Sequence, residues 1–172
     1  MATSWAPFAE PGPRVTEDDV RLFERYLGHG LPADYRAFLL AVNGGYASSS
    51  YCVFTLRRGG RHDESVLNTL YSLNATEDDL TAAQKHYNPD AALPKGLLQI
   101  GYDGMGGRIV LPLSGPHRGE VWYLDTEDDS EDWPSTRSDW FERSDVWKIA
   151  GSFREFMDSL GPLDDAGANA AR

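Results

Sequence analysis

Carboxylate side chains gather in the last third of the chain, and their density makes this stretch the first candidate for chemistry or binding. Asp125 to Asp145 contains nine acidic and two basic residues, in a 172-residue chain whose net charge is −11. The run lacks the D-x-[DN]-x-[DN]-G spacing and the distal glutamate of a calcium loop, so we expect a solvated acidic loop and no metal site. The carboxylates concerned are Asp125, Glu127, Asp128, Asp129, Glu131 and Asp132, and the aromatic residues Trp133, Trp140 and Phe141 follow them.

Glycines between Gly101 and Gly107 offer a second kind of chemistry, because a glycine-rich loop lets the backbone approach a phosphate closely. Phosphate loops run from a strand into the N-terminus of a helix. Here the segments on both sides are typical of strands, and Pro112 is incompatible with a helix interior. The pattern therefore favours a hairpin whose glycines supply positive φ angles.

The remaining candidate catalytic residues form no recognisable combination. No G-x-S-x-G nucleophile elbow occurs, and Cys52 lies in an apolar run that is typical of a buried thiol. The four histidines lie in different predicted elements without ligand spacing. We therefore predict that the protein is not an enzyme and binds no cofactor or metal. These histidines are His29, His62, His86 and His117.

The charge balance and the apolar pattern limit the partners. An excess of acid argues against nucleic acid as the direct partner, because phosphates would be repelled. The sequence has no run of eighteen apolar residues and no basic N-terminal region followed by an apolar segment, so we expect no membrane span and no secretory signal. A single cysteine fits a reducing compartment. We predict a cytoplasmic protein whose partner is another protein, and the oligomeric state stays open.

Periodicity and turn residues define the elements that position these side chains. Thr16 and Asp19 form a capping box ahead of a helical repeat, and Ser152 with Glu155 caps a last helix. Short apolar runs bounded by turn residues predict strands, and three of them form a β-meander. Two further helices are predicted, one beginning at Pro32 and one after a second capping box at Thr76 and Asp79. The predicted strands are 51–56, 66–73, 97–100, 108–113, 120–124 and 146–149.

This order of elements predicts an α+β fold, in which a mostly antiparallel β-sheet has helices packed on it. The length suits a single domain. We assign residues 1–14 to an extended N-terminal arm with at most Trp5 and Phe8 docked, residues 15–161 to the domain and residues 162–172 to a disordered tail.

Three segments, in this order, resemble one known family. The first is Leu31–Tyr35 with Phe38–Leu39 and Asn43–Gly45, the second runs from Leu97 to Tyr123, and the third is Ser152–Phe156. Their order and spacing are similar to the SMI1/KNR4 family of the SUKH superfamily from about Val15 to Leu160. The resemblance implies the same α+β fold for residues 15–161.

Bacterial members of that family resemble immunity proteins of polymorphic and contact-dependent toxin systems. The resemblance implies a cognate toxin as the partner, in particular a basic nuclease whose cleft is occluded by phosphate-like charge. Asp125 to Asp132 would then steer the toxin while Trp133, Trp140 and Phe141 anchor it, although these rings could instead be core residues. Tyr46, Tyr102 and Asp103 form a second candidate surface.

Two other functions stay open. The eukaryotic branch of the family resembles a scaffold in cell-wall signalling, which would make the protein an interaction module without a toxin. An enzyme is the third hypothesis. A toxin gene next to this one would favour immunity, and an isolated gene would favour a scaffold.

Overall fold

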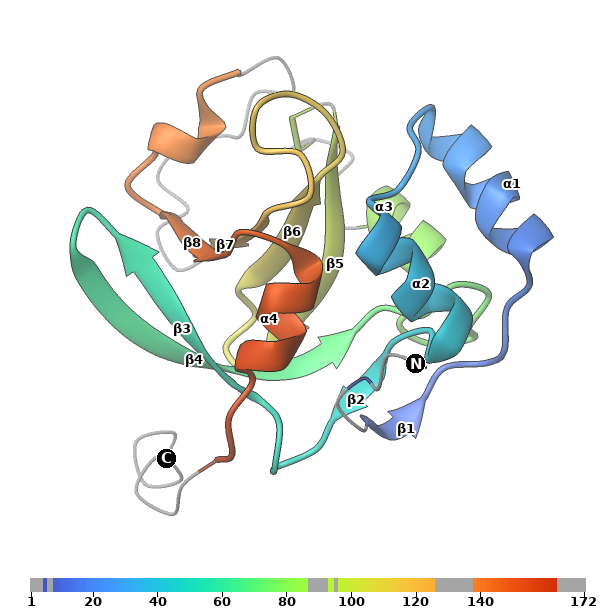
Figure 1. The fold of residues 1–172 in the computed structure, drawn as a ribbon, viewed down its shortest axis with the longest axis horizontal. Helices are drawn as coiled ribbons and strands as arrows, with labels where there is room; N and C mark the ends of the chain where they lie inside the picture. Colours follow the sequence, from blue (N-terminus) through green and yellow to red (C-terminus); the bar gives the residue numbers. More distant parts are fainter. Residues whose placement is uncertain (1–4, 6–7, 87–92, 95, 126–137, 164–172) are drawn as a thin grey trace.

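In a computed structural model of the protein, six antiparallel strands close into a barrel (Figure 1). The described part of the chain comprises residues 5, 8–86, 93–94, 96–125 and 138–163. The strands are β1 Phe8–Pro11, β2 Gly45–Ala47, β3 Val53–Arg58, β4 Arg61–Leu70, β5 Leu97–Asp103, β6 Arg108–Pro112, β7 Val121–Leu124 and β8 Val146–Ala150. The helices are α1 Glu17–Leu27, α2 Ala33–Ala41, α3 Leu80–His86 and α4 Phe153–Ser159, with a 3₁₀ turn η1 at Trp140–Glu142. None of these helices is long and apolar enough to cross a membrane.

The long strand β4 closes the barrel because its two halves pair with different neighbours. Its first half pairs with β3, and its second half pairs with β5, where Leu67 lies opposite Asp103 and Leu70 opposite Gly101. The ring therefore runs β4-β3-β8-β7-β6-β5 and back to β4, while β2 and β1 extend from β4. The predicted meander is confirmed as β5-β6-β7, and the α+β fold is confirmed with it.

The β3-β4 hairpin is longer than predicted. Arg57 pairs with His62 and Arg58 with Arg61, so only Gly59 and Gly60 form the turn, with φ angles of +52° and +80°. Both positive angles fit the two-residue turn that matches strand twist. The start of β4 was missed because residues 61–65 are polar on both faces and show no apolar alternation.

Local capping signals set most of the helix ends. Thr16 and Asp19 form the predicted capping box, and Ser152 accepts a hydrogen bond from the Glu155 amide at 3.0 Å. The predicted box at Thr76 is wrong, because α3 begins later: Asp79 accepts from the Ala82 amide at 2.8 Å.

Both chain ends contribute more than the sequence indicated. Phe8–Pro11 of the predicted arm forms β1 and pairs with β2, while the Trp5 ring packs 5.5 Å from that of Phe38. At the other end, the Leu163 amide donates to the Ser49 carbonyl at 2.7 Å. The rest of the predicted disordered tail, residues 164–172, lies outside the described residues.

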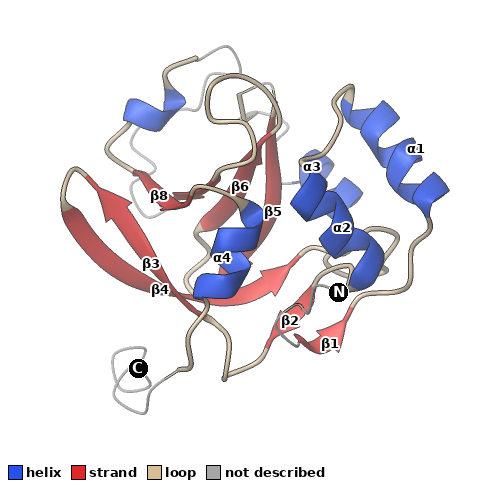
Figure 2. Ribbon diagram, viewed as in Figure 1, coloured by secondary structure: helices blue, strands red, loops and turns tan. Residues whose placement is uncertain are grey.

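Two apolar clusters fill the molecule. The larger one joins the barrel interior to α2 and α4, which lie side by side (Figure 2), with the Phe38 and Phe153 rings 4.9 Å apart. The smaller one lies on the other face of β6, β7 and β8 and is covered by η1. Strand β7 is buried on both faces, which fits its continuous apolar run.

Candidate functional site at the barrel mouth

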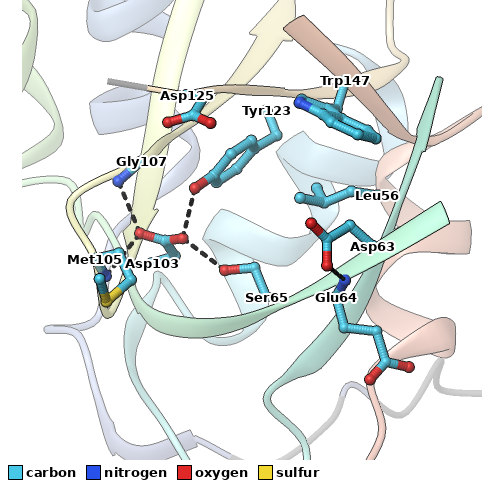
Figure 3. A pocket seen from close by; sticks show the side chains of 10 residues that line it. All are labelled: Leu56, Asp63, Glu64, Ser65, Asp103, Met105, Gly107, Tyr123, Asp125 and Trp147. Atoms are coloured by element: carbon cyan, nitrogen blue, oxygen red, sulfur yellow. Dashed lines mark hydrogen bonds between the residues drawn. The ribbon is translucent and has the colours of Figure 1, made fainter. Parts of the chain in front are cut away.

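A pocket of about 190 Å³ opens at one end of the barrel (Figure 3). The ends of β3, β5 and β7 meet the starts of β4, β6 and β8 at this point, because neighbouring antiparallel strands run in opposite directions. We call this pocket the barrel mouth. It is lined by Leu56, Asp63, Glu64, Ser65, Asp103, Met105, Gly107, Tyr123, Asp125 and Trp147.

The buried carboxylate of Asp103 organises the floor of the barrel mouth. Its Oδ1 accepts from the amides of Met105 and Gly107 at 2.9 and 2.7 Å. Its Oδ2 accepts from the hydroxyls of Ser65 and Tyr123 at 2.5 and 2.7 Å. Four donors around one carboxylate offset the cost of burying its charge, so Asp103 fixes the β5-β6 hairpin against β4 and β7.

The Tyr123 hydroxyl is held as a hydrogen-bond donor. Burial, followed by the hydrogen bond to Asp103 and the charges of Asp103 and Asp125, raises the pKa of Tyr123 far above its ordinary value. The hydroxyl therefore stays protonated at physiological pH and acts as a structural partner of Asp103. The Tyr123 hydroxyl can lie this close to the β5-β6 hairpin only because residue 107 is a glycine, since a Cβ there would lie 2.0 Å from the Tyr123 oxygen.

Replacing Gly107 with Ala is expected to lower the free energy of unfolding by about 1–3 kcal/mol, since the added methyl group must displace the Tyr123 ring. Urea unfolding of the purified variant measures this loss. Gly104→Ala is the matched control in the same hairpin, because a Cβ there would meet nothing within 4 Å. Equal stability of the two variants would contradict the described packing of Tyr123.

Acidic side chains surround this floor. Asp63, Glu64 and Asp125 come from β4 and from the end of β7, and Figure 3 shows Asp63 and Asp125 beside the pocket while Glu64 points away from it. The Asp125 amide donates to the Asp145 carbonyl at 2.8 Å, which fixes this residue at the mouth. The acidic stretch of the sequence therefore begins where other carboxylates already gather.

One wall of the barrel mouth is aromatic. The Trp147 ring of β8 lies near Leu56 and Tyr123 (Figure 3), and the Arg61 guanidinium lies 5.6 Å from its ring centroid. An aromatic wall beside carboxylates suits a cationic side chain, because the ring face and the carboxylates both attract positive charge.

The candidate anchor Trp140 is a core residue, and its proposed contact with a partner is therefore corrected. It is only 7% exposed and packs edge-on against Trp122 at 5.2 Å. The reason is that Trp122 points from β7 away from the barrel interior, and the Trp140 ring of η1 covers this large apolar side chain. Phe141 is half-buried beside His117 at 4.4 Å. Trp133 and the predicted steering residues Glu127, Asp128, Asp129, Glu131 and Asp132 lie outside the described residues.

The ends of the acidic stretch that are described sit on a rigid base. Arg143 and Asp145 form a buried ion pair with two hydrogen bonds of 2.9 and 2.7 Å. Trp140 and Val146 pack on the same side in the smaller apolar cluster. Asp125 and residues 140–145 are thus held against β7 and β8 by these contacts.

The second candidate surface is divided by the structure. Tyr46 lies on β2 and Tyr102 on β5, the strands on either side of this part of β4, and each is opposite Thr69 of β4. Asp103 follows Tyr102 in β5, points to the opposite face and is only 2% exposed, so it cannot be part of an exposed patch with the tyrosines. Asp103 therefore belongs to the barrel mouth, and Tyr46 and Tyr102 form a separate surface on the other face of the sheet.

Sequence reasoning missed Ser65, Tyr123, Asp63, Glu64 and Trp147. These residues come from three strands that are far apart in the sequence, and only barrel closure brings them together. No local pattern around Tyr123 indicates its hydrogen bond to Asp103, because Asp103 lies on another strand.

The described residues offer structural roles for the groups that could react. No group of three or more His, Cys, Asp or Glu side chains among them is placed to hold a metal ion. Cys52 is buried and its pKa is raised by burial, which makes the thiol a poor nucleophile. The Asp103 carboxylate accepts from four donors, so it is poorly placed to take a proton from a substrate.

Comparison with protein families identifies a relationship over most of the chain. The model of the SMI1/KNR4 family (SUKH-1) matches residues 14–159, which include the barrel, the four helices and the barrel mouth. A comparison with functionally curated proteins gave no match.

Proposed function

This chain belongs to the SMI1/KNR4 family (SUKH-1), and on that premise we propose that it is a cytoplasmic immunity protein that neutralises a partner bacterial toxin. The toxin is a nuclease, and the protein occludes its basic active-site cleft. Neither catalysis nor a cofactor is needed for this function, because a stable contact that excludes the nucleic acid is sufficient.

The observation that carries this proposal is the position of Asp125. This residue lines the barrel mouth together with Asp63 and the buried Asp103, and it opens the most acidic stretch of the chain. A nuclease cleft presents lysine and arginine side chains to phosphates, so an acidic face of this kind complements it. Asp125 and the carboxylates from Glu127 to Asp132 steer the toxin, while the barrel mouth and Trp147 receive basic side chains of the cleft.

Rigidity supports the same function. The mouth is framed by barrel strands, and the Asp103 network together with the Arg143 to Asp145 ion pair fixes its edges. A surface that is already ordered before binding loses little conformational entropy in the complex, which favours tight association. Trp140 contributes from the core, by holding the base of the acidic stretch.

The proposal is tested by co-expression with the toxin encoded beside this gene. We expect the toxin alone to stop bacterial growth, and the protein to restore growth and to co-purify with an inactive toxin variant. The control is the same toxin with an empty vector. Growth arrest despite co-expression, together with no complex on a sizing column, would contradict the proposal and favour the scaffold alternative.

A further inference from the structure

A second surface lies on the outer face of three neighbouring strands (Figure 1). Tyr46 of β2 pairs with Thr69 of β4, and Thr69 pairs with Tyr102 of β5. Residues directly opposite one another in a sheet point to the same face, so the two tyrosines flank Thr69, which is only 1% exposed. Tyr46 itself is 41% exposed.

Asp78 links the two tyrosines. The Tyr102 hydroxyl lies 3.4 Å from both carboxylate oxygens of Asp78. The charge of Asp78, together with a hydrogen bond to it, raises the pKa of Tyr46, so this hydroxyl also stays protonated. Asp78 therefore places a carboxylate next to both tyrosine hydroxyls.

The backbone around Asp78 is held in an uncommon conformation. Asp78 has a φ angle of +50°, and Asn74 in the same loop has +61°. The Asp78 carbonyl accepts from the Ser72 amide at 3.0 Å, which ties the loop to the end of β4. Aspartate and asparagine adopt this left-handed conformation more readily than other residues with a side chain, so the turn suits its sequence.

Exposed apolar residues connect this surface to the barrel mouth. Met105 is 68% exposed and Val66 is 37% exposed. The Gly104 amide donates to the Val66 carbonyl at 3.0 Å, so the hairpin tip lies beside β4. Met105 also lines the barrel mouth. We call Tyr46, Tyr102, Asp78, Val66 and Met105 together the tyrosine patch.

We propose that the tyrosine patch is a second contact region for the toxin, and that it binds a loop of the toxin bearing lysine or arginine. This inference rests on the proposed function and adds the extent of the contact with the toxin. The toxin would cover the barrel mouth and reach over β5 and β4 to β2. Tyrosine rings are rigid and bury large areas at small entropic cost, and their faces attract cations. Asp78 and the net charge of −11 supply the complementary field.

The charge of the patch argues against a second copy of this chain as the occupant. In a two-fold symmetric dimer the same surface faces itself, so Asp78 of one copy would approach the same acidic surface of the other. Like charges brought together in an interface oppose association. A basic partner meets no such repulsion.

Two substitutions test the tyrosine patch with matched controls. Tyr46→Ala removes an exposed ring, and Asp78→Asn removes the charge while keeping a residue type that tolerates a positive φ. The controls are Tyr26→Ala and Asp18→Asn on α1, where Tyr26 is 51% exposed and the Asp18 side chain 91% exposed. Circular dichroism melts of all four variants confirm that they fold.

Surface plasmon resonance against the inactive toxin domain gives the readout. We expect Tyr46→Ala to speed dissociation by about 10-fold or more and Asp78→Asn to weaken binding by about 5-fold or more, with both controls within about 2-fold of wild type. If wild type binds and the two patch variants match their controls, this inference fails while the proposed function stands. If wild type does not bind, both fail. The inference would also be overturned if the wild-type protein self-associates and Tyr46→Ala abolishes that self-association, because the tyrosine patch would then be a dimer contact.

Discussion

Replacing Phe38 with Ala is expected to lower the free energy of unfolding by about 3–5 kcal/mol, because it removes a large buried ring and leaves a cavity. Phe38 is fully buried where α2, α4 and the N-terminal arm meet. Its ring lies 4.9 Å from Phe153, 5.5 Å from Trp5 and 5.7 Å from Phe8. The loss therefore weakens the docking of the N-terminal arm as well as the contact between the helices.

Urea unfolding followed by tryptophan fluorescence measures this effect, and Leu22→Ala provides the control. Leu22 is a large apolar residue of α1 that is 61% exposed, so its truncation leaves no cavity. An unfolding midpoint for Phe38→Ala that equals the midpoint of Leu22→Ala would show that the aromatic packing between α2 and α4 is not as described.

Neutralising the acidic stretch is expected to slow binding of the toxin by about 10-fold or more at low salt. The variant replaces the five carboxylates with their amides and leaves Asp125 in the barrel mouth. Steering by opposite charges raises the association rate, whereas dissociation depends on short-range contacts, so the dissociation rate should change little. Surface plasmon resonance against the inactive toxin domain separates the two rates. The substitutions are Glu127→Gln, Asp128→Asn, Asp129→Asn, Glu131→Gln and Asp132→Asn.

The sequence predicts the elements well where the signal is local. The capping box at Thr16, the N-cap at Ser152 and the turns of the meander depend on residues within a few positions of one another, so a single sequence shows them. The pairing of Leu67 with Asp103 has no such local signature, because the two residues are far apart in the chain. Closure of the barrel therefore could not be predicted, and neither could the pocket that closure creates.

The candidate site shows the same limit at single residues. Trp140 next to a run of carboxylates fits an exposed anchor and a core residue equally well in sequence. Its contact with Trp122 decides for the core, and that contact depends on where η1 lies relative to β7. Asp103 was also predicted to be part of a candidate surface, together with Tyr46 and Tyr102. Its burial follows from the donors Ser65 and Tyr123, which other strands supply.

The most direct test of the account is the association rate constant of the wild-type protein with the inactive toxin domain, measured at several salt concentrations. Attraction between an acidic face and a basic cleft is screened over about 8 Å at physiological ionic strength, so we expect the rate to fall steeply as salt rises. The charge-neutralised variant should be slower at low salt and should lose most of this dependence. A wild-type rate that does not change with salt, or a neutralised variant that associates as fast as wild type and still protects cells, would contradict the acidic-face mechanism.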